Sequence, residues 1–481
     1  MRKLNEECGV IGIFGTKKQN VAQMTYYGLH ALQHRGQEGC GIAVNDQGVF
    51  NLHKNNGLVT EVFDVRTLES LGEGNIAVGH CRYGTADSKG AINCQPIVVN
   101  HIKGNLAIAH NGTLVNYAEL RSELELSGAI FHTTSDTEII SYVITRERIK
   151  SNSIEEAVNR AMGVLEGAYS LVISSSTKMI ACRDKFGFRP LCYGVTEDGT
   201  YIIASESCAL DVMGAKFIRD IEPGEIIVFK KGENNEVIVS EIKDNCKKVP
   251  ERACIFEYIY FARPDSVVDG SSVHEARKRA GRFLAQEHKI DADVVIGVPD
   301  SGLDGALGYA EESGIPYGIG FLKNKYIGRT FIQPSQSQRE KAVRMKLNVI
   351  KETVEGKRVV LIDDSIVRGT TSLYIVKLLR EAGAKEVHMC VTAPKFIDAC
   401  YYGTDIDSPK RLIANMHTTE EIAKIINVDS LGFLSVENVK KIPKCHACHD
   451  YCVACFTSEY PTKKPDLEYK SKFDKKIKQN I

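Results

Sequence analysis

The pattern of apolar and polar positions in the first half of the chain predicts many short strands and two helices. Apolar stretches bounded by turn residues predict strands at 9–14, 75–79, 106–110, 169–174, 201–205 and 225–229. Residues 21–33 and 137–149 have the spacing of amphipathic helices, and Ser135 or Asp136 is a suitable N-cap for the second. Strands and helices in this order predict two sheets with helices packed outside.

The second half has a different pattern, in which longer helices alternate with short apolar strands. A polar stretch rich in Lys, Asn and Glu, residues 230–251, separates the halves and is typical of an interdomain connection. Beyond it we expect helices at 272–288 and 371–382 and strands at 294–298, 359–362 and 387–392. This alternation predicts a doubly wound α/β domain with a parallel sheet. The Lys-rich tail from Pro461 predicts a solvated end.

Composition and charge narrow the class of protein. At 481 residues the chain exceeds what one hydrophobic core usually serves, so two domains of roughly 200 residues each are expected. Sixty-one Lys and Arg residues balance sixty-one Asp and Glu residues, which argues against nucleic acid or an anionic membrane as a partner. No apolar run approaches the roughly 18 residues of a membrane helix, and the charged residues 1–7 are unlike a signal peptide. We expect a soluble cytoplasmic enzyme whose 15 cysteines are thiols, nucleophiles or ligands rather than disulfides.

The strongest local motif is VVLIDDSIVRGTTS at residues 359–372, a predicted buried strand followed by Asp363, Asp364 and a turn of small and hydroxyl residues. Backbone N–H groups in this turn and at the start of the next helix would form a pocket for an anion. The carboxylates follow the carboxyl end of a strand, where parallel sheets bind ligands, and could hold ribose hydroxyls and a hard divalent cation. For the acidic pair alone, an ordinary strand–turn–helix with capping acids is the alternative.

This motif resembles the phosphoribosyl pyrophosphate (PRPP) signature of the type I phosphoribosyltransferases. In that family the turn binds the 5′-phosphate and the acidic pair binds the ribose diol. Residues 299–302 (PDSG) resemble the family's pyrophosphate loop, and the basic segment 323–336 resembles the flexible lid that closes over PRPP. The resemblance implies one Mg²⁺ per subunit at Ser301, Asp363 and Asp364, and PRPP contacts from Asp363, Asp364, Ser365, Arg368, Gly369, Thr370 and Thr371.

A second candidate site begins at Cys8, in the motif CGVIGIF. Inside the chain, a cysteine here would be an ordinary buried thiol. Removal of residues 1–7 would place an α-amino group of pKa about 7.7–8.0 beside a thiol of pKa about 8.5, so the amine could act as general base. Among later motifs, Arg82 could bind a carboxylate, the Asn111 amide and Gly112 N–H an oxyanion, and Asp136 a substrate ammonium. Taken singly, each could be a capped turn or a surface ion pair.

In this order the four motifs resemble the class II glutamine amidotransferases, as do residues 33–37 (QHRGQ) and 183–191 (RDKFGFRPL). The resemblance implies an α+β N-terminal-nucleophile glutaminase domain with α/β/β/α layers. An α/β type I phosphoribosyltransferase domain with a parallel sheet would follow it. The implied boundaries are a propeptide at 1–7, a glutamine amidotransferase domain at 8–235, a phosphoribosyltransferase domain at 254–435 and a C-terminal segment at 436–481.

Together the two sites resemble the amidophosphoribosyltransferase family, as does the junction motif CIFEYIYFARPDS at residues 254–266. That resemblance implies that ammonia released from glutamine attacks PRPP, giving 5-phosphoribosylamine, glutamate and pyrophosphate in the first committed step of purine synthesis. It also implies a homotetramer inhibited by purine nucleotides. Two alternatives are a salvage phosphoribosyltransferase, which would not need residues 1–230, and an inactive PRPP sensor, which would not need Cys8 and the oxyanion residues.

A last motif, CHACHDYCVAC at residues 445–455, contains four thiols and two imidazoles and by itself predicts a local zinc site. The short spacer between its Cys-x-x-Cys pairs leaves little chain to wrap around a tetrahedral ion. Some amidophosphoribosyltransferases carry a [4Fe–4S] cluster, and the resemblance implies one cluster per subunit, held by Cys254, Cys400, Cys452 and Cys455. The additional Cys445 and Cys448 leave the zinc alternative open.

Overall fold

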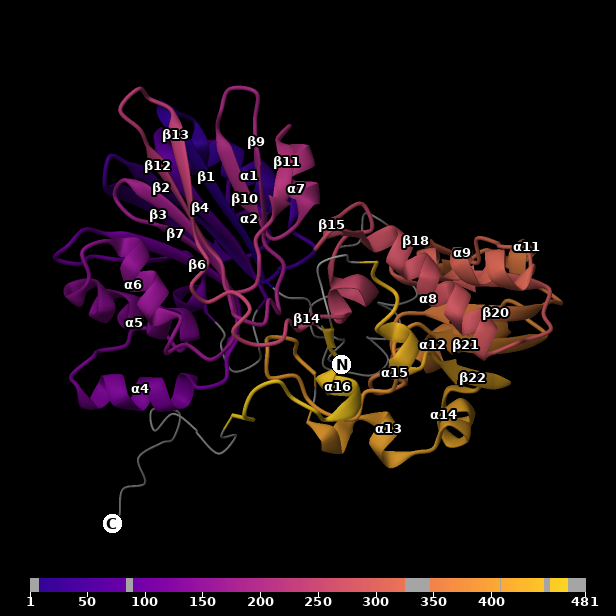
Figure 1. Cartoon of the computed structure of the whole chain (residues 1–481). Helices are drawn as coiled ribbons and strands as arrows, with labels where there is room; N and C mark the ends of the chain where they lie inside the picture. The colour runs from indigo at the N-terminus through magenta and orange to yellow at the C-terminus, as the bar shows by residue number, and fades with distance from the viewer. Residues whose placement is uncertain (1–7, 84–89, 325–346, 407, 445–449, 466–481) are drawn as a thin grey trace, which may run out of the picture.

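Each half of the chain forms one of two lobes (Figure 1). The computed structural model describes residues 8–83, 90–324, 347–406, 408–444 and 450–465. Among these residues, no helix is long and apolar enough to cross a membrane. The first lobe contains two antiparallel sheets, and the second is built on a parallel sheet.

The strands of the first lobe form a seven-stranded and a six-stranded sheet, in the orders β11-β9-β10-β1-β4-β2-β3 and β13-β12-β8-β7-β6-β5. The larger sheet contains β1 (Gly9–Gln19), β2 (Gly39–Asp46), β3 (Val49–Asn56), β4 (Gly74–Arg82), β9 (Cys192–Val195), β10 (Tyr201–Ala204) and β11 (Lys216–Asp220). The smaller sheet contains β5 (Ile97–Val99), β6 (Leu106–Leu114), β7 (Gly167–Ser174), β8 (Lys178–Arg183), β12 (Ile226–Lys231) and β13 (Val237–Ile242).

Four layers result because each sheet divides its side chains between two faces. Alternate residues of both sheets, such as Val10, Val78 and Ala109, form a core between the sheets. Helices cover the opposite faces, which confirms the predicted α/β/β/α layers (Figure 1). The larger sheet packs on α1 (Val21–Ala31), α2 (Val59–Val62), α3 (Val65–Leu71) and α7 (Ser207–Val212), and the smaller on α4 (Tyr117–Leu126), α5 (Asp136–Lys150) and α6 (Ile154–Ala161).

Side-chain caps explain where the two predicted helices of this lobe begin. Asn20 caps α1 by accepting a hydrogen bond from the backbone N–H of Gln23 at 3.0 Å. Ser135 caps α5 by accepting from the backbone N–H of Thr137 at 3.3 Å. Asp136 is therefore the first residue of α5, at the positive end of the helix dipole. Both helices lie where the sequence predicted them.

The predicted connection at 230–251 is partly wrong, because it contains a strand. β13 pairs with β12 from Val237 to Ile242, so the first domain continues beyond residue 235. Val237 and Val239 pack against the core between the sheets, whereas Ile238 points away and is 37% exposed. The polar composition of the stretch concealed this alternation, which is typical of a half-buried edge strand.

The central sheet of the second lobe has four parallel strands in the order β17-β20-β21-β22, which confirms the predicted parallel sheet and adds β22, a strand that was not predicted. On the other side of β17, Val295 forms an isolated parallel bridge with Tyr317. After β17 the chain first passes along one side of this strand, at Tyr317, and then crosses to form β20 on its other side. The gap between β17 and β20 is therefore a topological switch point. The strands are β17 (Val294–Gly297), β20 (Arg358–Asp363), β21 (Glu386–Val391) and β22 (Ser430–Phe433), with a separate pair β18 (Phe321–Lys323) and β19 (Leu347–Val349). The helices are α8 (Val273–Glu287), α9 (Gly302–Ser313), α11 (Lys351–Val354), α12 (Thr370–Glu381), α13 (Ile413–Met416), α14 (Thr419–Ile426) and α15 (Val436–Val439).

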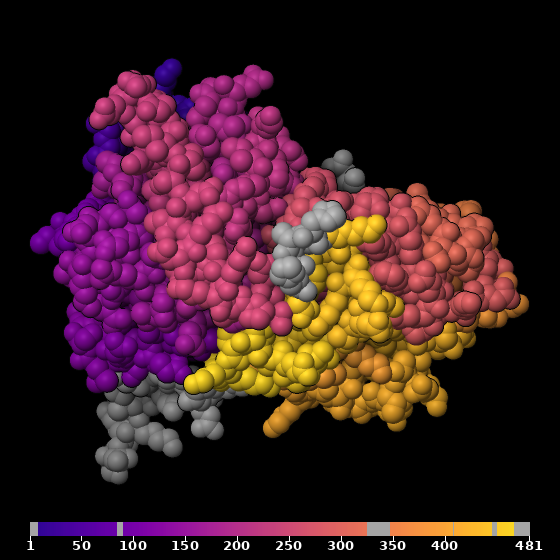
Figure 2. Space-filling model, viewed as in Figure 1, coloured from indigo at the N-terminus to yellow at the C-terminus, as the bar shows by residue number. Residues whose placement is uncertain are grey.

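The C-terminal segment returns to the junction between the lobes. β23 (Tyr451–Cys452) pairs in parallel with β14 (Ala253–Cys254), so Cys254 and Cys452 are register neighbours. Val439, Ile442 and Phe456 belong to the same buried cluster as the central sheet, so residues beyond 435 complete the core of the second lobe. Figure 2 shows this segment, in yellow, along the boundary between the lobes. The junction also contains a π-helical turn, η2 (Glu257–Phe261), the strands β15 (Val267–Val268) and β16 (Ser271–Ser272), and α16 (Ala454–Thr457).

Candidate active sites

Strand alternation directs three predicted glutaminase residues into the space between the two sheets. Cys8, Arg82 and Asn111 are in step with the residues of β1, β4 and β6 that face this space, namely Val10 and Phe14, Ile76 and Val78, and Ala107 and Ala109. Gly9 is paired with Cys81 across β1 and β4, so Cys8 and Arg82 lie at the same end of the sheet. The Cys8 Sγ lies 3.9 Å from the carbonyl oxygen of Tyr83.

One buried histidine, His80, connects the two sheets beside these residues. The Nε2 of His80 lies 3.0 Å from the carbonyl oxygen of His110, which precedes Asn111 on β6. Burial lowers the pKa of His80 to about 3, so the ring is neutral at physiological pH and donates one hydrogen bond to this carbonyl. The contact sets the spacing between β4, which carries Arg82, and β6, which carries Asn111.

The Asn111 side chain is 1% exposed, yet neither its nitrogen nor its oxygen has a hydrogen-bond partner among the described residues. A buried amide without partners costs about 1–3 kcal/mol, so such a group is expected where a ligand supplies the partner. Gly112 follows with a φ of 135°, and a Cβ there would lie 2.2 Å from the carbonyl oxygen of Ala168. Only glycine fits this close approach of β6 to β7.

Asp136 is held at the start of α5, on the helix side of β6. Its Oδ2 accepts a hydrogen bond from the backbone N–H of Leu114 at 3.0 Å, and its Oδ1 lies 3.5 Å from the Nδ1 of His110. Burial raises the pKa of Asp136, but His110 and the N–H groups of Leu114 and Thr137 outweigh burial and lower it overall. The group is therefore a carboxylate at neutral pH, as the binding of a substrate ammonium requires.

The predicted PRPP residues lie at the carboxyl ends of β17 and β20, on both sides of the topological switch point. Asp363 ends β20 and is buried, and its Oδ1 accepts the backbone N–H of Asp364 at 2.9 Å. The Asp364 carboxylate in turn accepts hydrogen bonds from the hydroxyls of Ser301 and Ser365. The structure thus brings Ser301, Asp363 and Asp364 together, and oxygen donors of this kind suit a hard divalent cation.

The turn after the acidic pair leads into α12 through Gly369. Its φ of 75° is in the left-handed region, and a Cβ there would lie 2.8 Å from the Cδ1 of Ile413. The same Ile413 donates its backbone N–H to the carbonyl oxygen of Val367 at 2.9 Å. Thr370 and Thr371 are the first residues of α12, so their N–H groups lie at the positive end of the helix, where an anion is favoured.

The basic segment predicted to form a lid is described only at its start. Lys323 ends β18 and forms an ion pair with Asp300, which follows β17 in the predicted pyrophosphate loop. Residues 325–336 of the predicted lid lie outside the described residues, as does the predicted propeptide, residues 1–7.

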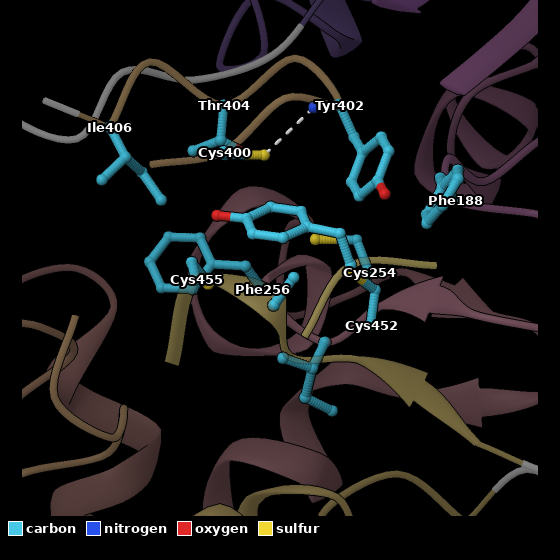
Figure 3. Close-up of a pocket in the computed structure, with 12 residues that line it drawn as sticks. Phe188, Cys254, Phe256, Cys400, Tyr402, Thr404, Ile406, Cys452 and Cys455 are labelled. Atoms are coloured by element: carbon cyan, nitrogen blue, oxygen red, sulfur yellow. Dashed lines mark hydrogen bonds between the residues drawn. The ribbon is translucent and has the colours of Figure 1, made fainter. Parts of the chain in front are cut away.

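Four cysteines line one cavity at the junction between the lobes (Figure 3). They come from β14 (Cys254), β23 (Cys452), α16 (Cys455) and the loop after β21 (Cys400). Aromatic side chains complete the lining, and the ring of Phe188 stacks on that of Tyr402 with centroids 4.0 Å apart. The backbone N–H of Tyr402 donates to the Cys400 Sγ at 3.4 Å. Burial, and next the nearby Cys400, raise the pKa of Cys452 to about 12, so this thiol is protonated without a cation beside it.

The cysteine cavity does not contain a preformed metal site among the described residues. Within the described ranges, no group of three or more His, Cys, Asp or Glu side chains is arranged to hold a metal ion. The four sulfurs of a zinc site would lie within about 4 Å of one another, because each Zn–S bond is about 2.3 Å long. Cys445 and Cys448 of the zinc alternative lie outside the described residues.

The residues that hold these groups in place were not predicted from the sequence. His80 and His110 precede Arg82 and Asn111 by two and one positions, and Thr392 donates its backbone N–H to the carbonyl oxygen of Asp363 at 3.0 Å. His110 at the end of one predicted strand and His80 directly after another were the available signal. Their roles depend on which strands pair and which faces meet, and the sequence of one chain does not contain that information directly.

Family models match both lobes. Residues 80–212 match a glutamine amidotransferase domain and residues 270–424 a phosphoribosyl transferase domain. The fold, the sites and these matches therefore define a chain in which a glutamine amidotransferase domain is joined to a phosphoribosyltransferase domain. The chain belongs to the amidophosphoribosyltransferase family, since relatives with that activity match it over nearly its whole length.

The amidophosphoribosyltransferase of Methanocaldococcus jannaschii is 53% identical over 465 residues, which cover 95% of this chain and 98% of that one. The Bacillus subtilis enzyme is 48% identical over 466 residues, covering 96% and 95% of the two chains. A solved structure of the B. subtilis glutamine PRPP amidotransferase, complexed with ADP and GMP, matches with a TM-score of 0.86 and 47% identity, covering 95% and 98%. The chain is thus an enzyme of the first step of purine biosynthesis, in which glutamine-derived ammonia is transferred to PRPP. This excludes the salvage and sensor alternatives.

Proposed function

We propose that the two sites divide this reaction, with ammonia released at Cys8 and PRPP held at the turn from Asp363 to Thr371. The Asn111 amide is the observation that supports the proposal most. It faces the same inter-sheet space as Cys8, and both of its polar atoms are buried without a partner in the described part of the chain. A structural asparagine would have its own partners, whereas an oxyanion-binding one takes its partner from the reaction.

Removal of residues 1–7 precedes catalysis and frees the α-amino group of Cys8. In glutamine hydrolysis this amine is the base that accepts the thiol proton. Sulfur attacks the carboxamide carbon, and the Asn111 amide and Gly112 N–H stabilise the negative oxygen. The C–N bond then breaks, the nitrogen takes the proton and leaves as ammonia, and water hydrolyses the glutamyl thioester to glutamate. Arg82 binds the α-carboxylate of glutamine and Asp136 its α-ammonium. An intact mass that lacks residues 1–7 is the measurement for the propeptide.

In the second lobe, Asp363 and Asp364 bind the ribose hydroxyls of PRPP. Ammonia forms a bond to C1 as the bond from C1 to pyrophosphate breaks, and loss of a proton gives 5-phosphoribosylamine. The transfer has to exclude bulk water, since protonated ammonia has no lone pair with which to attack. One Mg²⁺ per subunit, held by Ser301, Asp363 and Asp364, would neutralise charge on the leaving pyrophosphate. The 5′-phosphate is bound by Ser365, Arg368, Gly369, Thr370 and Thr371.

The cysteine cavity is proposed to hold one [4Fe–4S] cluster per subunit, with Cys254, Cys400, Cys452 and Cys455 as ligands. Three observations fit this group: the four thiols share one cavity, its lining is aromatic, and a backbone N–H is directed at one of the sulfurs. A cluster of four irons separates its ligand sulfurs more widely than a single ion does. Its role is structural, because neither half-reaction transfers electrons.

The proposal also covers inhibition by purine nucleotides and the oligomeric state. The B. subtilis relative was solved with ADP and GMP bound, and we extend purine-nucleotide binding to this chain as a means of inhibition. We also propose a homotetramer that acts in the cytoplasm. Light scattering after size-exclusion chromatography measures the assembly, and PRPP turnover with added nucleotide measures the inhibition.

Replacement of Cys8 by Ala tests the division of labour. Pyrophosphate release that depends on glutamine should be abolished, because the nucleophile is lost, while release driven by added ammonia at high pH should stay at the wild-type rate. Cys246→Ala is the matched control, since Cys246 is another partly buried thiol of the first lobe and should leave both rates unchanged. Loss of both activities in a folded Cys8→Ala protein would contradict the two-site proposal.

A further inference from the structure

Arg35 lies at the centre of a buried network of charges. Its side chain has no exposed surface, and its Nη1 donates to Glu206 Oε1 at 2.6 Å and to Glu257 Oε2 at 3.0 Å. Its Nη2 donates to Glu257 Oε1 at 2.8 Å. Its Nε donates to the carbonyl oxygen of Cys8 at 3.1 Å. One planar guanidinium therefore holds two carboxylates and the backbone of the candidate nucleophile at the same time.

Two glycines allow Arg35 to reach Cys8. A Cβ on Gly9 would lie 3.6 Å from both the Cβ and the Cδ of Arg35, so the arginine side chain packs directly under the backbone that follows the nucleophile. A Cβ on Gly36 would lie 2.6 Å from the carbonyl carbon of Cys81 and 2.7 Å from the nitrogen of Arg82. The turn that carries Arg35 is thus wedged between the start of β1 and the end of β4, and its place relative to Cys8 is set by packing on both sides.

The carboxylates of this network come from both lobes. Glu206 precedes α7 in the first lobe, whereas Glu257 begins the π-helical turn η2 in the junction. Arg189, also fully buried, lies 3.5 Å from Glu257 and donates to the carbonyl oxygen of Tyr402 at 2.8 Å. His34, whose Nε2 lies 2.7 Å from Glu206 Oε1, joins the two arginines and two glutamates of this network. His34 and Arg35 outweigh burial and keep the pKa of Glu206 well below its usual range, so this carboxylate stays charged.

We propose that Arg35 is a positioning residue for Cys8, and that Glu257 of the junction keeps Arg35 in place, so that glutamine hydrolysis depends on the docked second lobe. The proposal rests on the function proposed for Cys8. Holding the Cys8 carbonyl restricts rotation of the residue whose α-amino group is the base and whose thiol is the nucleophile. Without Glu257, the guanidinium loses two of its hydrogen bonds, and Cys8 loses its fixed orientation.

The alternative is that Arg35 and Glu257 only hold the lobes together. A second buried ion pair between the lobes, Arg183 with Asp269, allows the two roles to be compared. Arg183 donates to both carboxylate oxygens of Asp269, at 2.7 and 3.2 Å, and to the carbonyl oxygens of Ile221 and Gly187. Among the described residues, the hydrogen-bond partners of Arg183 do not include a residue of the candidate sites. If buried ion pairs served only to join the lobes, weakening either pair would affect the enzyme in the same way.

The experiment compares Arg35→Lys and Glu257→Gln with Asp269→Asn in the full-length protein. Lysine keeps the charge but cannot donate to Cys8 and both carboxylates together, and glutamine keeps the shape of Glu257 without its charge. Both variants should lower kcat for glutamine hydrolysis by about tenfold or more, with KM for glutamine unchanged, since the loss is one of orientation. Ammonia-driven synthesis should stay at the wild-type rate. Alkylation of Cys8 by iodoacetamide, measured on its peptide by mass spectrometry, should slow in parallel.

Asp269→Asn is the matched control, because asparagine tolerates the positive φ of 45° at this position. It should lower the unfolding temperature but leave glutamine hydrolysis and Cys8 alkylation unchanged. Equal losses in all three variants would overturn the positioning role. Wild-type hydrolysis in Glu257→Gln, with Cys8→Ala inactive, would overturn this inference while leaving the proposed function intact. A Cys8→Ala protein that still hydrolyses glutamine would instead overturn the proposed function itself.

Discussion

Asn111 and Asn45 are both buried asparagines on strands of the first lobe, but their side chains have opposite surroundings. The Nδ2 of Asn45 donates to the carbonyl oxygen of Ser175 at 2.8 Å, and its Oδ1 accepts the backbone N–H of Gly48 at 2.7 Å. Asn111 has no such partner among the residues described. The fold therefore uses Asn45 to join the two sheets, whereas it gains no hydrogen bond from Asn111. A polar group that lowers stability in this way is expected at a site of ligand chemistry.

The contrast predicts different outcomes for the two alanine variants. Asn111→Ala should lower kcat for glutamine hydrolysis by about 10²–10³-fold, the usual effect of removing one oxyanion donor. Its free energy of unfolding should not fall, because no hydrogen bond is lost and an unsatisfied buried amide is removed. Asn45→Ala should cost about 1–3 kcal/mol of stability and leave kcat unchanged. Urea denaturation and a glutaminase assay measure both quantities, and a large loss of stability in Asn111→Ala would assign Asn111 a structural role.

Among the elements, the strand–turn–helix from β20 through Gly369 to α12 determines the shape of the PRPP site. Its acidic pair follows directly from the end of the strand, and its threonines follow from the start of the helix. Between them the turn is held by Ile413, which bonds to Val367 and packs against Gly369. α13 therefore supports the phosphate-binding turn from outside, and a change at Gly369 is transmitted to the backbone N–H groups that would bind the 5′-phosphate.

Gly369→Ala should raise KM for PRPP in ammonia-driven synthesis by about tenfold or more, because misplaced N–H donors bind the phosphate less well. Gly356→Ala is the matched control. Gly356 has a similar φ of 71°, but a Cβ there would have no atom within 4 Å. Both variants should lose about 1–2 kcal/mol of stability from the left-handed backbone. An unchanged KM in Gly369→Ala would show that the turn does not require its present shape.

Elements with strong local signals could be predicted from the sequence, whereas those defined by long-range pairing could not. The helices α1, α5, α8 and α12 and the strands β17, β20 and β21 lie where apolar spacing and caps placed them. β13 was missed because a polar composition concealed its alternating burial. Among site residues, motifs indicated Cys8, Asn111 and Asp363. The contacts of Glu257 with Arg35, 222 positions apart in sequence, follow only from the packing of the lobes.

At the scale of the whole molecule, buried connections join the two lobes. Arg35 with Glu257 and Arg183 with Asp269 are charged, while the pairing of β14 with β23 brings the C-terminal segment back to the junction. The cysteine cavity lies at this pairing, with cysteines from three separate parts of the chain. A metal cluster bound there would tie the junction, the loop after β21 and the C-terminal segment together, and its loss would weaken all three.

This arrangement predicts that the proposed cluster stabilises the fold. Protein purified without oxygen should be brown and contain about four irons per chain. Removal of the iron should lower the unfolding temperature, because thiols whose pKa is raised by burial return to the neutral form and no longer bind the three segments together.

Cys400→Ser should lower both the iron content and the unfolding temperature, because it removes one proposed ligand from the loop. Cys246 is a partly buried thiol elsewhere, and Cys246→Ser should change neither quantity. Iron and zinc are measured by elemental analysis and unfolding by calorimetry, each on anaerobic and oxygen-exposed samples. Oxygen should bleach the wild-type protein and lower its unfolding temperature together, since one group accounts for both. The contrary result is colourless protein with one zinc per chain, in which the zinc is retained in Cys400→Ser but lost when Cys445 or Cys448 is replaced. That result would assign the metal to the local motif instead.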